Sequence, residues 1–172
     1  MNKKIKLIYR NYTKNNSDKT VKKLSIFCKN HHRELFISNN LKLALRYELD
    51  GIYIPAFNYK KNFKNIQSKK KFKIIGSAHN IKEIKIKEEQ GCNQIFLSPI
   101  FYNPKNKKYL NIIKFNLIAL ETKKGIIALG GIDNKNIRKL SLTKSIGFGA
   151  ISLFQKKSPV KTGLFNKVFF SN

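Results

Sequence analysis

Residues 125–133 read Gly-Ile-Ile-Ala-Leu-Gly-Gly-Ile-Asp, and this stretch decides the fold class. An uninterrupted apolar run is typical of a parallel strand that is covered on both faces. The paired Gly130 and Gly131 allow the backbone to turn and to approach a ligand closely. A helical pattern follows over residues 134–142, and free amides at a helix start attract phosphate. The stretch therefore predicts a buried strand, a phosphate-binding turn and a helix in succession.

The rest of the chain repeats this alternation of strands and helices. Seven short apolar runs are predicted to be strands, at residues 5–9, 35–38, 52–54, 72–75, 94–97, 126–129 and 148–152. Helical patterns occupy most of the intervals, and a last amphipathic helix is predicted over 162–170. The alternation indicates an α/β fold with a parallel sheet. We expect an incomplete (β/α) barrel of the TIM type, one strand short of eight, rather than a doubly wound sheet, which normally carries Gly-x-Gly-x-x-Gly.

The composition is that of one packed domain, which we place over residues 1–172. A hydrophobic fraction of 41% excludes a disordered chain. No run approaches the roughly 18 apolar residues of a membrane span, and no signal-like stretch opens the chain, so we expect a cytoplasmic protein without a membrane partner. Cys28 and Cys92 lie far apart in the sequence and outside any zinc-finger spacing, so neither a metal site nor a disulfide is indicated.

The net charge of +27 raises the question of a polyanionic partner. The surplus is spread evenly, however, with 15 net positive charges in residues 1–73 and 12 in residues 74–172. It comes from 32 Lys and only 4 Arg, beside 23 Ile and 20 Asn, which is typical of a genome rich in A and T. Nucleic-acid readers usually favour Arg. We therefore expect any nucleic-acid binding to be non-specific and salt-sensitive.

Two further stretches place polar groups at predicted strand ends. Residues 147–152 read Gly-Phe-Gly-Ala-Ile-Ser and bring the Ser152 hydroxyl to the end of the last strand. Because the loops after the last two strands of a (β/α) barrel commonly bind phosphate, we favour a phosphate site here over glycines that only allow tight turns. Residues 74–80 read Ile-Ile-Gly-Ser-Ala-His-Asn. They bring His79 to the same face, where it can act as an acid, a base or a phosphate donor, or be structural.

Four motifs together resemble the thiamine-phosphate synthase and TenI family. They are Gly-Ser-Ala-His at 76–79, Phe-Leu-Ser-Pro-Ile-Phe at 96–101, Ala-Leu-Gly-Gly-Ile at 128–132 and Gly-Phe-Gly-Ala-Ile-Ser at 147–152. The resemblance covers residues 5–154. It implies a (β/α) barrel that joins a pyrimidine diphosphate to a thiazole phosphate and releases pyrophosphate with the assistance of Mg²⁺. TenI relatives instead act on the thiazole.

The resemblance also implies roles for individual residues. At the thiazole-phosphate end, Gly131, beside Gly130, resembles the glycine whose amide meets the phosphate, and Ile151 and Ser152 resemble its backbone partners. At the diphosphate end the resemblance implies Arg10, Ser77 and, from an Asn-Asp motif, Asn39. The Thr-x-Thr-Lys stretch of the family is replaced here by residues 102–107, and Lys105, Lys107 or Lys108 is expected to bring positive charge to the diphosphate instead. His79 is the catalytic candidate because it is the only histidine expected at this face.

The sequence departs from the family at both metal-binding carboxylates, which fall at Asn40 and Asn58. Asn is a poor replacement because Mg²⁺ prefers charged carboxylate oxygens, so we predict no metal ligands among these residues. The TenI histidine falls at Pro99. The first βα unit of the family is missing as well, which predicts a barrel that is open between the strands at Ile5 and Phe148. Another copy of the chain or the C-terminal helix is expected to cover that edge.

These observations leave three functional hypotheses. The first is a transferase of the thiamine-phosphate synthase type with a degraded metal site, acting on small phosphorylated substrates. The second is a non-catalytic protein that binds or senses a phosphorylated metabolite. The third is a Lys-rich nucleic-acid binder on the same barrel.

Overall fold

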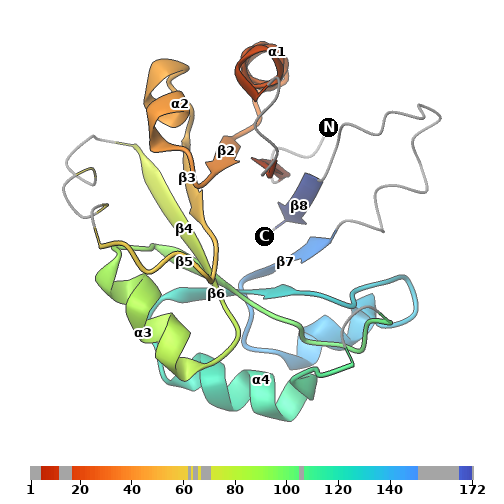
Figure 1. The fold of residues 1–172 in the computed structure, drawn as a ribbon. Coiled ribbons are helices and arrows are strands. Elements are labelled where there is room, and N and C mark those ends of the chain that lie inside the picture. Colours follow the sequence, from red (N-terminus) through yellow and green to blue (C-terminus); the bar gives the residue numbers. More distant parts are fainter. Residues whose placement is uncertain are drawn as a thin grey trace.

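Eight strands form a closed ring in the computed structural model, which describes residues 5–11, 17–61, 63, 66, 71–104, 107–150 and, for the backbone, 167–171. The ring follows chain order from β1 to β8 (Figure 1). The strands are β1 (Lys6–Tyr9), β2 (Leu35–Ser38), β3 (Gly51–Ile54), β4 (Lys73–Ala78), β5 (Gln94–Leu97), β6 (Gly125–Leu129), β7 (Gly147–Ala150) and β8 (Lys167–Ser171). Neighbours from β1 to β7 are all parallel, so the seven predicted strands and the barrel class are confirmed.

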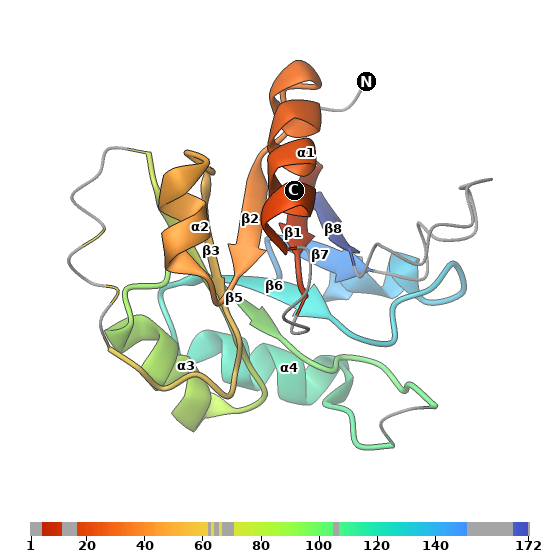
Figure 2. The same cartoon turned by 45° about the horizontal axis from the view of Figure 1, so that its top comes forward.

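Helices cover the outside of the ring. They are α1 (Ser17–Asn30), α2 (Leu41–Arg46), α3 (Ile81–Glu89), α4 (Asn111–Leu120) and the 3₁₀ helix η2 (Ile137–Leu142). The first two lie beside β1 to β3, whereas α3 and α4 lie against β4 to β6 (Figures 1 and 2). Two apolar clusters fill the space under these two pairs of helices. Among the helices that the structure describes, none is long and apolar enough to cross a membrane.

The C-terminal segment differs from its prediction. The helix expected over 162–170 is wrong in its last residues, where β8 runs antiparallel to both β1 and β7. Its backbone pairs Val168 with Ile8 on one side and Phe170 with Gly149 on the other. Two sheet edges with unpaired N–H and C=O groups outweigh the helical periodicity of this segment, since an extended strand satisfies both edges at once. The described strands therefore leave no open edge for a second copy of the chain.

The barrel interior holds a third cluster, to which each of the strands β1 to β6 contributes one buried residue. Its buried members are Ile8, Phe36, Tyr53, Ile75, Phe96 and Ile127. These side chains fill the lumen, so the barrel is packed rather than hollow. Residues two positions further along each strand consequently emerge at its carboxyl end, where the site residues are expected.

Candidate functional site

Arg10 lies at the mouth of the barrel, directly after β1. Its guanidinium carbon is 5.5 Å from the centre of the Tyr53 ring, in a cation–π arrangement. Tyr53 in turn meets Phe96 edge to face, with 5.9 Å between the ring centres. Since both aromatic rings belong to the lumen cluster, they form the floor on which the half-buried arginine rests.

Three serines share one position relative to the lumen. Ser77 follows Ile75 by two residues, as Ser38 follows Phe36 and Ser98 follows Phe96, and all three serines are buried. Because side chains alternate along a strand, the three hydroxyls point to the same side as these lumen residues. Sequence reasoning identified Ser77 but missed Ser38 and Ser98. The recurring pattern of a large apolar residue, any residue and then serine could have indicated them.

His79 is held in one orientation at the end of β4. Its Nδ1 lies 2.8 Å from the carbonyl oxygen of Ser98 and 3.3 Å from that residue's hydroxyl. A carbonyl oxygen can only accept, so Nδ1 is the donor of this hydrogen bond, and in the neutral imidazole Nε2 is then the acceptor. The backbone amide of His79 also donates to Glu83 Oε2 at 2.8 Å. The imidazole is thus an exposed, oriented group whose second nitrogen can accept a proton.

The two positions after β6 require glycine for two reasons, a left-handed backbone conformation and a close contact with the segment after β5. Gly130 and Gly131 have φ of +90° and +72°, in the left-handed region that favours glycine. A Cβ on Gly131 would lie 2.4 Å from the carbonyl oxygen of Phe101, and one on Gly130 would lie 2.7 Å from Pro99 Cβ. The Phe101 amide also donates to the Gly130 carbonyl at 3.1 Å. The glycines therefore let the segment after β5 cross directly over the end of β6.

Among the described residues, backbone donors remain unused at this turn, the amide of Gly131 included. In the described part of the chain the amide of Gly131 donates no hydrogen bond, although its carbonyl accepts from Asn136 Nδ2 at 2.7 Å. A free amide at a strand end suits an anionic oxygen. The geometry is compatible with the predicted phosphate position at this turn.

The helix predicted over 134–142 is wrong in type and extent, because a turn precedes the short 3₁₀ helix η2. Asp133 explains the difference. Its Oδ1 accepts the amides of Lys135 at 2.8 Å and Asn136 at 3.0 Å. The carboxylate takes up amides that an α-helix would have offered to a phosphate. The backbone amides that remain for the predicted phosphate are therefore those of the glycine turn.

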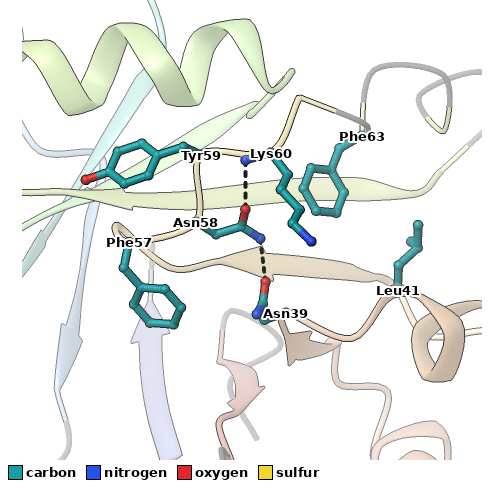
Figure 3. A pocket seen from close by; sticks show the side chains of 7 residues that line it. All are labelled: Asn39, Leu41, Phe57, Asn58, Tyr59, Lys60 and Phe63. Carbon is teal, nitrogen blue, oxygen red and sulfur yellow. Dashed lines mark hydrogen bonds between the residues drawn. The ribbon is translucent and has the colours of Figure 1, made fainter.

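Three asparagines meet at the ends of β2 and β3. Asn58 Nδ2 donates to Asn39 Oδ1 at 2.5 Å, and Asn58 Oδ1 accepts from the Lys60 amide at 2.9 Å (Figure 3). Asn40 is the N-cap of α2, where its Oδ1 accepts from the Leu43 amide at 3.0 Å. Asn39 reaches Asn58 from a left-handed backbone conformation with φ of 56°. The two residues predicted at carboxylate positions are therefore both part of the local hydrogen bonding.

A cavity of about 710 Å³ opens beside this cluster. It is lined by Asn39, Leu41, Phe57, Asn58, Tyr59, Lys60 and Phe63 (Figure 3). The lining thus combines aromatic rings with two amides and one lysine. It lies next to the mouth, on the side of β2 and β3.

The structure does not place some of the predicted residues among the groups described above. Ile151, Ser152 and Lys105 lie outside the described residues, and their roles stay predictions. Lys107 is described and exposed, in the loop that leaves the carboxyl end of β5. In the same loop, Tyr102 and Tyr109 meet edge to face, with 6.2 Å between ring centres.

Comparison with known proteins identifies the family. A family model described as thiamine monophosphate synthase matches residues 3–154. The chain belongs to this family. A thiamine-phosphate synthase of Prochlorococcus marinus strain SARG is 32% identical over 139 residues, which cover 77% of this chain and 38% of that protein. A putative thiamine-phosphate synthase 2 of Aquifex aeolicus is 28% identical, covering 79% of this chain and 74% of that protein.

The fold of the thiamine monophosphate synthase family is matched as well. A thiamine phosphate pyrophosphorylase from Pyrococcus furiosus superimposes with a TM-score of 0.67, covering 84% of this chain and 70% of that chain. The identity is 17%, so this likeness concerns the fold. The chain spans less than half the length of the first curated relatives it matches.

Magnesium, which the family resemblance implies, does not fit the residues present at the β2–β3 ends. Asn39, Asn40 and Asn58 each use the side-chain oxygen to accept a hydrogen bond within the protein. Neither of the two expected carboxylates is present, and Mg²⁺ favours charged oxygens. Within the described ranges, no group of three His, Cys, Asp or Glu side chains could hold a metal ion.

Proposed function

We propose that this protein is a transferase that joins a pyrimidine diphosphate to a thiazole phosphate in thiamine biosynthesis and releases pyrophosphate. Membership of the thiamine monophosphate synthase family supports the substrate class. The observation that carries the proposal is the arrangement at the barrel mouth. The free Gly131 amide, Arg10 and Ser77 occupy the same carboxyl-terminal end of one parallel sheet.

The proposed chemistry is electrostatic and positional. The thiazole phosphate rests on the Gly131 turn, with Ile151 and Ser152 as its expected partners from the end of β7. Negative charge develops on the departing pyrophosphate, and Arg10, Ser77 and a loop lysine such as Lys107 meet it. Arg10 is held over Tyr53 before the substrate arrives, so little reorganisation is needed.

The deciding experiment incubates the purified protein with both substrates and follows thiamine phosphate and pyrophosphate together. We expect both products in equal amounts. Arg10→Ala should abolish both, because no other described arginine follows a strand at this end. Arg138→Ala is the matched control, since Arg138 is an exposed residue of η2. Product formation that survives Arg10→Ala would contradict the assigned role.

A second candidate function is favoured by one observation, the internally hydrogen-bonded asparagines at the two carboxylate positions. A protein with this arrangement could bind the thiazole phosphate without turning it over. The same experiment separates the two functions. Binding of the thiazole phosphate without any formation of thiamine phosphate would contradict the transferase proposal. It would support the alternative, a protein that binds a phosphorylated metabolite without converting it.

A further inference from the structure

A buried lysine outside the proposed site stands under the loop that carries Asn58. Lys87 belongs to α3 and is 0% exposed. Its ammonium donates to the carbonyl oxygens of Pro55 at 2.8 Å and Asn58 at 2.7 Å, and to Gln90 Oε1 at 2.9 Å. Three acceptors around one nitrogen require three N–H donors, which only the charged amine has.

Gln90 completes the arrangement from the end of the same helix. It is also 0% exposed, and its Nε2 donates to the carbonyl oxygens of Asn58 and Lys60, each at 2.8 Å. Together, Lys87 and Gln90 make four hydrogen bonds to the backbone of residues 55–60. A loop without a helix or strand of its own is thereby tied to a helix that packs on the barrel.

The barrel also makes room for this lysine. A Cβ on Gly76 would lie 2.9 Å from Lys87 Cδ and 2.8 Å from Cys92 Sγ. Gly76 is the first residue of the Gly-Ser-Ala-His motif, and the proposed chemistry gives it no role. Its lack of a side chain admits the lysine stem between β4 and α3.

Burying an ammonium without a carboxylate partner is costly. Burial lowers the pKa of Lys87 to about 8, although the Glu83 carboxylate opposes this shift. A methionine of similar length would avoid this cost at the same place. The hydrogen bonds to the loop are what distinguish lysine from an apolar residue here.

We propose that Lys87 and Gln90 are positioning residues that hold the 55–60 loop so that Asn58 reaches Asn39 at the barrel mouth. Pro55, Asn58 and Lys60 are fixed through their carbonyl groups, and this orients the Asn58 side chain. The loop-positioning role stands on the contacts alone. Its consequence for diphosphate binding rests on the proposed function.

Hydrogen exchange tests the loop without relying on activity. The amide of Asn58 donates to the Pro55 carbonyl at 3.1 Å, and that of Lys60 to Asn58 Oδ1. In Lys87→Met these loop amides should exchange at least about tenfold faster, while the amides of α3 and β4 keep their rates. Lys85→Met is the matched control, because Lys85 is an exposed lysine on the same helix.

A second variant keeps the test decisive if Lys87→Met does not fold. Gln90→Met retains the ammonium and removes both Gln90 donors, and it should accelerate the same loop amides. Combined in one chain, the two substitutions should change the loop rates by less than the product of their separate effects, because Lys87 and Gln90 both donate to the Asn58 carbonyl and are hydrogen-bonded to each other. Parallel acceleration throughout the barrel, or an unchanged loop, would overturn the positioning role.

Measurements of ligand affinity test the functional consequence, with inorganic pyrophosphate and a thiazole phosphate as separate probes. In Lys87→Met the affinity for pyrophosphate should fall about tenfold, and that for the thiazole phosphate should change less than about twofold. An equal loss for both probes would indicate a structural role only. If the proposed function is wrong, the wild-type protein will not bind pyrophosphate, yet exchange will still distinguish Lys87→Met from Lys85→Met.

Discussion

The two sides of the barrel mouth, at β6 and at β2–β3, present different chemical groups: backbone groups at β6 and side chains at β2 and β3. At β6 the predicted phosphate position is backbone, a left-handed glycine turn with a free amide under a crossing segment. At β2 and β3 the corresponding positions are side chains, and three asparagines hydrogen-bond within the protein there. One side requires a particular backbone shape, whereas the other has hydrogen-bonded amides at the two positions where the family resemblance implies carboxylates.

The two sides differ in what a substitution would disturb. A side chain at Gly131 must collide with the Phe101 carbonyl, so the turn and the fold constrain each other. At position 40 an asparagine caps α2 as well as an aspartate would. An amide at this position therefore costs the helix cap nothing relative to a carboxylate.

The largest effect on ligand affinity should come from Gly131→Ala, which alters the backbone turn on the β6 side. We expect thiazole-phosphate affinity to fall more than about 100-fold, because the added methyl group collides with the Phe101 and Tyr102 carbonyls. A left-handed alanine and the collision together should cost about 3 kcal/mol of unfolding free energy. Calorimetric titration and thermal unfolding measure the two effects.

Gly125→Ala is the control for this prediction. It lies at the other end of β6, where an added Cβ would meet the movable tip of the Ile146 side chain. It should leave thiazole-phosphate affinity unchanged. Strong binding that persists in Gly131→Ala would show that the phosphate does not sit on this turn.

The next effect concerns His79, which lies between the two sides at the end of β4. His79→Ala should lower turnover about 100-fold, as expected for the catalytic candidate, and leave thiazole-phosphate affinity within about twofold. Steady-state rates and titration on the same preparation check both numbers. A turnover equal to that of the wild type would assign the imidazole a structural role at the Ser98 carbonyl.

The barrel was predictable from the sequence because each strand is a short apolar run with a turn behind it. The seven strand positions are confirmed with small shifts at their ends. The C-terminal strand was missed, since residues 167–171 become extended only where β1 and β7 offer two edges, a condition set by distant parts of the chain. Local periodicity cannot contain that information.

The candidate site was only partly predictable. Motifs indicated Arg10, Ser77, His79 and Gly131, whose roles stay predictions, and the structure brings these four to one end of the barrel. The contacts of Lys87 were missed because a lysine in a charged helix reads as a solvated residue. Only the packing of α3 under the 55–60 loop reveals that it is buried.

A smaller effect is expected on the β2–β3 side, where the dependence of activity on Mg²⁺ tests the roles of Asn40 and Asn58. Any activity of the wild-type protein should depend weakly on Mg²⁺, and Asn40→Asp combined with Asn58→Asp should raise that dependence about tenfold. Asn40→Asp keeps the helix cap, while Asn58→Asp loses the Nδ2 donor to Asn39. Rates over a magnesium titration provide the measurement. Complete inactivation of the wild type by a chelator would show that other residues bind the metal.

The smallest effect is expected at the opposite end of the barrel, where Glu34 pairs with Lys6 and Lys73. Glu34→Gln should lower the unfolding free energy by about 1 kcal/mol, and it should change neither ligand affinity, since both proposed sites lie at the carboxyl ends of the strands. Equilibrium denaturation with urea measures the loss.

The pH dependence of that loss has a defined sign. Partial burial raises the pKa of Glu34, but hydrogen bonds and charges from Lys73 and Lys6 outweigh it and hold the pKa below its ordinary value. The unfolded chain therefore binds this proton more readily, and the stabilisation is present above the ordinary pKa and lost as pH falls through the lowered one. The difference in unfolding free energy between wild type and Glu34→Gln should therefore shrink as pH falls below the ordinary pKa of glutamate, and it should vanish below the lowered one. A change in thiazole-phosphate affinity in this variant would show that the two ends of the barrel are coupled, and the contrast between the β6 side and the β2–β3 side would then no longer be local.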